Sequence, residues 1–237
     1  MNNKELQLAW DFVNKSQRNI FLTGKAGTGK TTFLHRLKLN SHKRMVIVAP
    51  TGVAAINAKG VTIHSFFQLP FGPILPDDTL SSSNEFKNKF SKTKINIIKS
   101  LDLLVIDEIS MVRADLLDAI DKTLRRYKDR NQVFGGVQVL MIGDLQQLSP
   151  VVRDNEWELL KPFYNNAYFF SSNAYQYCNP ITVELKHIYR QDNPKFINIL
   201  NEIRSNNLSQ QSIEELNKRF DSNFSPSEND FPRNSRL

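Results

Sequence analysis

Residues Gly24 to Thr31 read GKAGTGKT and place two glycines, a lysine and a hydroxyl side chain at the spacing of a phosphate-binding loop. Glycine suits such a loop because its backbone must approach phosphate oxygens in conformations that a side chain would block. Lys30 is placed to reach β- and γ-phosphates, and the Thr31 hydroxyl to hold Mg²⁺. The predicted nucleotide-binding residues are Gly24, Ala26, Gly27, Thr28, Gly29, Lys30, Thr31 and Thr32.

The flanking segments decide whether this stretch is a phosphate site or a flexible Gly-Lys turn. An apolar run, Asn19–Thr23, precedes the glycines, and Thr32–Leu37 has helical spacing of apolar residues. A strand, a glycine loop and a helix in this order aim backbone N–H groups and a helix N-terminus at an anion. The context therefore favours the phosphate site.

Two adjacent acids, Asp107 and Glu108, follow the apolar run Leu103–Ile106. Beside a triphosphate, Asp107 would complete the Mg²⁺ shell, so that Thr31 and Asp107 are the predicted metal ligands. Glu108 would polarise the attacking water as general base. A strand followed by Asp-Glu is also common as a helix cap, so this assignment depends on the pairing with the phosphate loop.

Gln147 and Arg190 extend the candidate catalytic set. Gln147 lies just beyond the apolar run Val139–Ile142, where a glutamine can contact the γ-phosphate or the water, although a plain strand-exit loop is the alternative. Arg190 is a candidate cation for charge that develops in the transition state, the alternative being an ordinary surface arginine. The predicted catalytic residues are Lys30, Asp107, Glu108, Gln147 and Arg190.

The elements that must position these residues alternate along the chain. Strands are predicted at Ile20–Thr23, Met45–Ala49, Leu101–Ile106, Val137–Ile142, Tyr168–Phe170 and Ile181–Leu185. Helices are predicted at Lys4–Phe12, Thr32–Leu39, Val53–Ala58, Arg113–Tyr127 and Pro194–Arg204. Continuous apolar strands that alternate with helices are typical of an α/β fold with a mainly parallel sheet and helices on both faces. Ligands of such sheets lie at the carboxyl ends of the strands.

The sequence becomes polar after Ser205, so residues 1–205 are predicted as one α/β lobe, and residues 206–237 as a linker or an unfinished segment. Pro70–Ser83 is rich in proline, serine and aspartate and is predicted as loop. The basic stretch Phe86–Lys99 is interpreted as a solvated helix face that leads to the next strand.

Composition sets wider limits. The 237 residues are 40% hydrophobic, which suffices for a sizeable core, and the net charge of +7 permits an acidic partner such as nucleic acid without establishing one. One cysteine excludes an intramolecular disulfide. We find no apolar run of the ~20 residues that a membrane helix needs and no secretory signal. We therefore expect a cytoplasmic protein without a membrane partner.

Five segments together resemble the Pif-type family of superfamily 1B DNA helicases. They read FLTGKAGTGKTT, VIVAPTGVAAINAKGVTIHSFF, LLVIDEISMV, GDLQQLSPV and ELKHIYRQ, occur in the family's order, and lie within Leu6–Arg204. The resemblance implies a RecA-like motor lobe, ATP and Mg²⁺ as cofactors, and hydrolysis coupled to 5′-to-3′ translocation on single-stranded DNA. It also implies roles in DNA repair, recombination and telomere maintenance.

The resemblance further implies roles for individual residues. Gln7, 17 positions before Gly24, matches the family's adenine-reading glutamine, although an exposed helix glutamine is the alternative. Gln147 and Arg190 look like the family's γ-phosphate contacts. The residues implied in single-stranded DNA binding are Pro50, Thr51, Gly52, His64, Ser65 and Phe66. Their hydroxyl and imidazole groups can bind phosphates, and an exposed ring can stack on a base. Because Phe66 and Phe67 are adjacent, we expect at least one of them in the core.

Helicases of this family place ATP between two RecA-like lobes, and this chain ends at Leu237, before a second such unit could form. We therefore expect a monomeric first motor lobe whose partners are single-stranded DNA and the missing second lobe. Such a lobe should have weak ATPase activity at best and no unwinding activity. Two other hypotheses stay open: a nucleotide- or DNA-binding module without turnover, and a different P-loop class such as a helicase loader or small kinase.

Overall fold

The computed structural model describes residues 3–76, 90–189, 191 and 193–222. The chain divides into two compact units, Met1–Arg190 and Gln191–Leu237, which are considered separately. Arg190, the second half of the loop predicted at 70–83 and the beginning of the basic stretch 86–99 lie outside the described residues.

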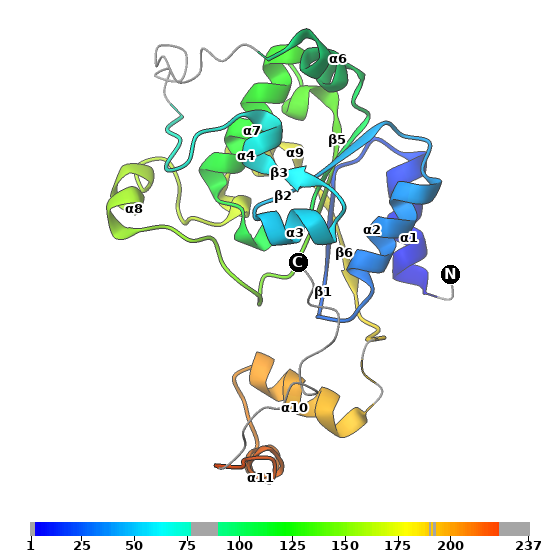
Figure 1. Cartoon of the computed structure of the whole chain (residues 1–237), viewed down its shortest axis with the longest axis vertical. Helices are drawn as coiled ribbons and strands as arrows, with labels where there is room; N and C mark the ends of the chain where they lie inside the picture. The colour runs from blue at the N-terminus through cyan, green and yellow to red at the C-terminus, as the bar shows by residue number, and fades with distance from the viewer. Residues whose placement is uncertain (1–2, 77–89, 190, 192, 223–237) are drawn as a thin grey trace. The chain divides into compact units, whose positions relative to one another are not determined.

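The first unit is built on a parallel sheet, shown in Figure 1. The strands of the described part are β1 (Ile20–Gly24), β2 (Met45–Ala49), β3 (Val61–Thr62), β4 (Leu103–Ile106), β5 (Gln138–Gly143) and β6 (Ile181–Leu185). They lie in the order β3-β2-β4-β5-β1-β6, and each neighbouring pair is parallel. The predicted α/β fold with a parallel sheet is therefore confirmed.

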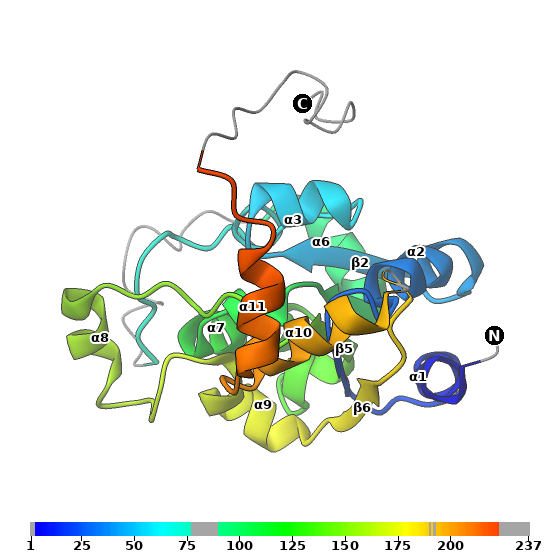
Figure 2. The ribbon, with the colours of Figure 1, turned by 90° about the horizontal axis from the view of Figure 1, so that it is seen from below.

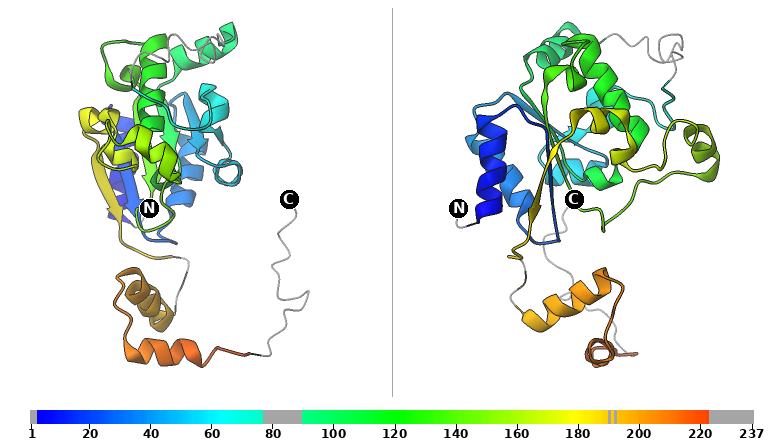
Figure 3. Two further views of the ribbon diagram at one scale, coloured as in Figure 1. Left: turned by 90° about the vertical axis from the view of Figure 1, so that its left-hand side faces the viewer. Right: turned by 180° about the vertical axis from the view of Figure 1, so that it is seen from behind.

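Helices cover both faces of this sheet, as Figure 3 shows from two sides. Side chains of successive strand residues point to opposite faces, so Leu103 and Val105 of β4 enter one core and Leu104 and Ile106 the other. The first core is shared with α1 (Lys4–Lys15) and α2 (Lys30–Asn40). The second is shared with α4 (Ile63–Phe67), α6 (Lys92–Ser100), α7 (Ala114–Tyr127) and α9 (Asn173–Cys178).

Two further helices of this unit are described. The short helix α3 (Gly52–Asn57) packs against β2 and β3, at the opposite edge of the sheet from α1 and β6 (Figure 2). Helix α8 (Asp154–Leu160) contributes Leu160 to a small separate cluster with Tyr164. In the described part, the 3₁₀ helices η2 (Ile109–Met111), η3 (Val133–Gly136) and η4 (Phe169–Ser171) lie in the connections.

The strand predicted at Tyr168–Phe170 is wrong. These residues enter η4, and only Tyr168 makes an isolated bridge, to Arg113. The ring of Phe169 is fully buried and meets Phe21 edge-on, with 5.4 Å between the ring centroids. The apolar run is thus explained by burial of a turn against the sheet, and not by pairing within it.

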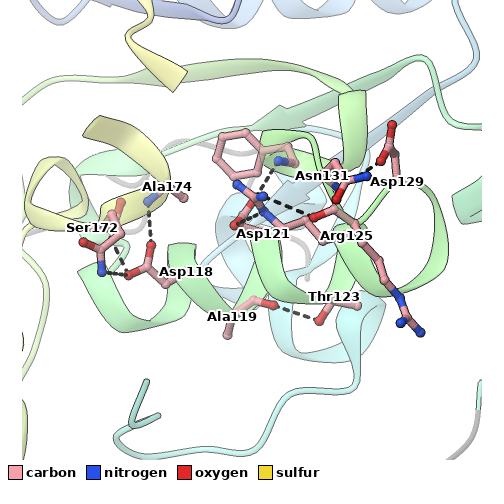
Figure 4. A network of polar contacts seen from close by, with 12 residues as sticks. Asp118, Ala119, Asp121, Thr123, Arg125, Asp129, Asn131, Ser172 and Ala174 are labelled. Carbon is pink, nitrogen blue, oxygen red and sulfur yellow. Dashed lines mark hydrogen bonds and ion pairs between the residues drawn. The ribbon is translucent and has the colours of Figure 1, made fainter. Parts of the chain in front are cut away.

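Two half-buried carboxylates on α7 hold the neighbouring elements in place (Figure 4). Asp118 accepts hydrogen bonds from the backbone N–H of Ala174 at 2.8 Å and the hydroxyl of Tyr164 at 3.0 Å. Asp121 accepts from the Arg125 guanidinium at 2.7 Å and from the backbone N–H of Phe134. Burial raises the pKa of both Asp118 and Asp121 above the ordinary aspartate value. Helix α7 therefore anchors α9 and η3 through polar as well as apolar contacts.

The second unit contains α10 (Pro194–Arg204) and α11 (Gln210–Asn217). Helix α10 has the predicted bounds and begins with a proline after the capping side chain of Asn193. Helix α11 lies in the segment predicted as linker or unfinished, and Glu202 joins the two helices by accepting a hydrogen bond from the Ser209 N–H at 2.9 Å. In the described residues, no helix has the length and apolar character needed to cross a membrane.

Candidate nucleotide-binding site

The phosphate-binding loop joins β1 to α2, as the sequence predicts. Gly24, Gly27 and Gly29 have φ angles of +150°, +78° and +92°, in a region that favours glycine over other residues. Gly29 precedes the first residue of α2, so the N–H groups of the first turn of that helix face the end of the loop. The backbone therefore forms an anion site of the kind that suits phosphate.

Two side chains stabilise the loop from within. The Lys30 ammonium donates to the carbonyls of Gly24 at 2.5 Å and Lys25 at 3.1 Å, so its charge lies in the hollow of the loop. The hydroxyl of Thr28 is directed inward, since the residue is fully buried and donates to the Lys25 carbonyl at 2.8 Å. Thr28 thus supports the loop from behind, since its N–H also donates to the Lys25 carbonyl, at 3.3 Å, and the residue does not line the pocket.

The acid pair stands directly at the end of β4. The Asp107 N–H donates to the Val48 carbonyl at 2.9 Å, which ties the acids to the neighbouring strand β2. Burial and the nearby charge of Glu108 raise the pKa of Asp107 to about 6, while the positive charge of Lys30 acts in the opposite direction. Glu108 has a left-handed backbone, with φ 51° and ψ 45°. Such a conformation is costly for a non-glycine residue and is found preferentially at functional sites.

A tight turn after β5 presents Gln147. The carboxylate of Asp144, which is almost fully buried, accepts from the Gln147 side-chain amide at 3.2 Å and from the Gln146 N–H at 3.1 Å. The Gln147 N–H donates to the Asp144 carbonyl at 3.0 Å. Asp144 therefore fixes the side chain of Gln147 as well as its backbone.

These elements converge on a pocket of about 490 Å³. Its lining residues are Ala26, Gly27, Gly29, Lys30, Thr31, Thr32, Glu108, Gln147 and Tyr189. The pocket thus brings together four segments that are far apart in the sequence, namely the phosphate loop, the end of β4, the turn after β5 and the stretch after β6 that carries Tyr189. The lining does not include Gly24, Thr28 or Asp107. Gly24 and Thr28 contribute to the conformation of the loop, and the charge of Asp107 interacts with that of Lys30.

Tyr189 is the lining residue that the sequence analysis missed. Its ring carbon Cδ2 lies 3.7 Å from the position that a Cβ atom on Gly29 would take. Its N–H donates to the Gly27 carbonyl at 2.8 Å, and its hydroxyl accepts from the Asn3 side-chain amide at 3.0 Å. Its position directly before the candidate residue Arg190 could have drawn attention to it. No local sequence pattern, however, indicates that an aromatic residue after a strand will contact the phosphate loop.

The structure places Gln7 outside this pocket. The Gln7 side chain is exposed on α1 and donates to Asp11 at 3.2 Å, and it does not belong to the lining. Arg190 lies outside the described residues. Their predicted roles toward adenine and the γ-phosphate stay predictions.

The segments predicted to contact DNA flank β3. Thr51 and Thr62 use their side chains to cap α3 and α4, while Gly52 and Ser65 are exposed and Pro50 is half-buried. The structure differs from the expectation of an exposed ring at Phe66: Phe66 and Phe67 are 5% and 2% exposed. Ile63, Phe66 and Phe67 share one face of α4 by their i, i+3, i+4 spacing, and this face enters the core. His64 is half-buried on another face.

Fold and pocket together define a RecA-like P-loop lobe, a class in which a glycine loop after the first strand of a parallel sheet binds nucleotide phosphates. A model of the PIF1-like helicase family matches residues 4–214, and the chain belongs to this family. The resemblance seen in the sequence is thereby confirmed.

The chain is similar to several ATP-dependent DNA helicases. It is 33% identical to PIF1 of Emericella nidulans over 223 residues, which are 88% of this chain and 28% of that protein. It is also 33% identical to human PIF1 over 203 residues, or 84% of this chain and 29% of that protein. The chain thus spans less than a third of the length of these relatives.

Solved structures show the same relationship. Bacteroides Pif1 bound to single-stranded DNA superposes with a TM-score of 0.87 at 45% identity, over 96% of this chain and 51% of that chain. Bacteroides Pif1 in complex with ADP-AlF₃ and single-stranded DNA gives a TM-score of 0.86 at 44% identity, over 96% of this chain and 52% of that chain. The similarity covers nearly all of this chain and about half of each structure.

Proposed function

We propose that this chain is the ATP-binding motor lobe of a 5′-to-3′ DNA helicase, which couples ATP hydrolysis to movement along single-stranded DNA together with a second RecA-like lobe. The observation that carries this proposal is the pocket in which the phosphate loop, Glu108 and Gln147 meet. The family membership and the single-stranded DNA in the related Bacteroides structures support the choice of DNA as the track.

Each residue group has a part in the proposed hydrolysis. The loop amides and Lys30 would bind the β- and γ-phosphates. The Thr31 hydroxyl and the Asp107 carboxylate are oxygen donors, which suit Mg²⁺. When bound, Mg²⁺ would neutralise charge on the phosphate oxygens. Glu108, which lines the pocket, would orient the attacking water and accept its proton, with Gln147 held by Asp144 close to the γ-phosphate.

We assign two further contacts by family resemblance. Gln7 would read the adenine, and Arg190 would contact the γ-phosphate. Pro50, Thr51, Gly52, His64 and Ser65 would line the DNA path. The exposed positions of Gly52 and Ser65 are compatible with such contacts.

We also propose residues 1–205 as the motor lobe and residues 206–237 as the linker to, or beginning of, the second lobe. An isolated first lobe lacks the cleft whose closing and opening drives translocation, so its ATPase activity should be weak and it should not unwind DNA. We also expect it to be a monomer. The cytoplasmic location stays a prediction.

Steady-state ATP hydrolysis by the purified chain, with and without oligo-dT, tests the proposal. We expect slow turnover that rises with oligo-dT and is lost in Glu108→Gln, while ATP binding is kept. Glu158→Gln is the matched control, because Glu158 lies on the exposed side of α8 and pairs with Lys161. Tight binding without turnover would instead favour a binding module. Catalytic unwinding of a 5′-tailed duplex would contradict the need for a second lobe.

A further inference from the structure

An aromatic pair stands at the surface beside the segment that we propose to contact DNA. Phe71 is 88% exposed, and its ring stacks on the imidazole of His64, with 4.7 Å between centroids and 19° between planes. One face of the phenyl ring is therefore covered by His64, and the high exposure leaves the other face to solvent.

The loop that carries Phe71 is firmly attached on both sides. Leu69 before it and Ile74 after it are buried, at 5% and 4% exposure. The carboxylate of Asp115, itself 1% exposed, accepts from the Ile74 N–H at 2.8 Å, and the Arg113 guanidinium donates to the Gly72 carbonyl. Burial of a phenyl ring is favourable, so a ligand that covers the free face of Phe71 on this anchored loop would gain from the contact.

The charge around the pair suits a polyanion. Lys94 of the basic helix α6 lies 3.9 Å above the ring centroid of Phe66, so this cation stands beside α4. Arg113 and Asp115 form an ion pair at 2.7 Å, so the charge of Arg113 offsets a nearby carboxylate that would otherwise repel a polyanion. Burial and the charge of Arg113 lower the pKa of His64 below the ordinary histidine value, opposed by Asp115.

We propose that Phe71, seated on His64, is the ring of this lobe that stacks on a base of single-stranded DNA. This inference rests on the proposed function, in which His64 and Ser65 lie on the DNA path, and it replaces Phe66, whose ring is in the core. His64 is then a positioning residue that holds the phenyl plane. Base–aromatic stacking tolerates any sequence, because every base has a π face, and this suits a motor that moves along DNA.

Binding of fluorescein-labelled oligo-dT, followed by anisotropy at fixed low salt, tests the proposal. Phe71→Ala should weaken binding about tenfold, the equivalent of ~1.4 kcal/mol and within the range for one stacked base. Phe71→Trp should bind like the wild type and lose tryptophan emission on adding oligo-dT. With an abasic oligonucleotide, which keeps the phosphates, wild type and Phe71→Ala should bind equally.

The control variant is Phe220→Ala, because Phe220 is comparably exposed at 79%. It should bind oligo-dT like the wild type, and the melting temperature of both alanine variants should be unchanged. If the wild type binds oligo-dT and Phe71→Ala binds it equally well, the stacking role is overturned while the proposed function stands. An equal loss on the abasic strand would also overturn it. If the wild type itself does not bind, the proposed function fails as well.

Discussion

The side-chain amide of Asn3 donates a hydrogen bond of 3.0 Å to the hydroxyl of Tyr189, across 186 residues of sequence. Asn3 also caps α1, since its side-chain oxygen Oδ1 accepts from the Leu6 N–H at 3.0 Å. One buried side chain thus fixes the beginning of the first helix and the aromatic wall of the nucleotide pocket. The backbone of Tyr189 also ties the chain after β6 to the phosphate loop, since its N–H donates to the Gly27 carbonyl at 2.8 Å.

Tyr189→Ala should weaken ATP binding about five- to tenfold, because it removes an aromatic wall whose contacts are worth ~1 kcal/mol or more. Tripolyphosphate, which has no base or ribose, should bind the variant as it binds the wild type. Isothermal titration calorimetry measures both affinities.

Tyr189→Phe is the control for the ring. It keeps the wall and removes the bond to Asn3, so ATP affinity should stay near the wild-type value while the free energy of unfolding falls by about 1 kcal/mol. Equal losses for ATP and tripolyphosphate in Tyr189→Ala would show that the ring acts by supporting the loop, and would contradict direct contact with the nucleoside.

Gly24→Ala should destabilise the lobe by about 2–4 kcal/mol and weaken nucleotide binding. A Cβ atom at Gly24 would lie 2.7 Å from the Leu185 carbonyl oxygen and 2.9 Å from the Thr28 hydroxyl, at a φ angle that disfavours alanine. Because the Gly24 carbonyl accepts from Lys30, a shift of this residue also moves the ammonium group. Urea denaturation and nucleotide titration measure the two effects.

Gly52→Ala is the matched comparison, since nothing lies within 4 Å of an added Cβ atom and its φ angle is ordinary. Its stability should be unchanged or raised by no more than about 1 kcal/mol. If Gly24→Ala changes neither the stability nor the nucleotide affinity, the junction of β1 and the loop can shift to accommodate a Cβ atom, and the close packing described here does not constrain it.

Asp102→Asn should reduce stability at neutral pH by ~0.2–1 kcal/mol, the range for a solvent-exposed ion pair. Asp102 pairs with Arg44 at 2.8 Å, and both side chains are partly exposed. Hydrogen bonds from Arg44 lower the pKa of Asp102 to about 2. Because this folded-state pKa lies below the ordinary aspartate value, the stabilisation is present above about pH 4 and is lost as pH falls toward 2.

The measurement is the difference in unfolding free energy between wild type and Asp102→Asn at pH 7 and at pH 2.5, which cancels the titration of the other carboxylates. The difference should shrink at the lower pH. A difference that is the same at both values would mean that the charge of Asp102 does not contribute. Arg44→Gln should behave like Asp102→Asn, and the double variant should lose little more than either.

Much of the sheet could be predicted from local patterns. Met45–Ala49 forms β2 with the predicted bounds, because a buried parallel strand is apolar at every position. Helix α10 carries its own initiation signal, with Pro194 after a capping asparagine. Phe169 shows the limit: an aromatic run reads as a strand, but its burial in a turn depends on Phe21, which lies far away in sequence.

The same distinction applies to the site. The sequence predicts Lys30, Thr31 and Glu108 as site residues, and all three line the pocket. Each belongs to a short motif directly after a strand, so its role can be inferred from local sequence. Tyr189 reaches the pocket through a tertiary bond to Asn3, and no spacing indicates it. Phe66 was predicted on a DNA-facing surface by family resemblance, whereas the face of a five-residue helix is decided by packing. Whether one aromatic ring is exposed depends on the tertiary packing around it, and short sequence patterns do not specify that packing.

The two cores meet along β4, where alternate residues serve opposite sides and the proposed catalytic acids, Asp107 and Glu108, follow immediately. Loss of one codon between Leu103 and Ile106 would rotate the rest of the strand by half a turn, exchange its inner and outer residues, and swing Asp107 away from the phosphate loop. A deletion scan of the gene should therefore find this stretch intolerant of even a single in-frame triplet. The turn at Asn206–Ser209 between α10 and α11 should accept changes of length far more readily.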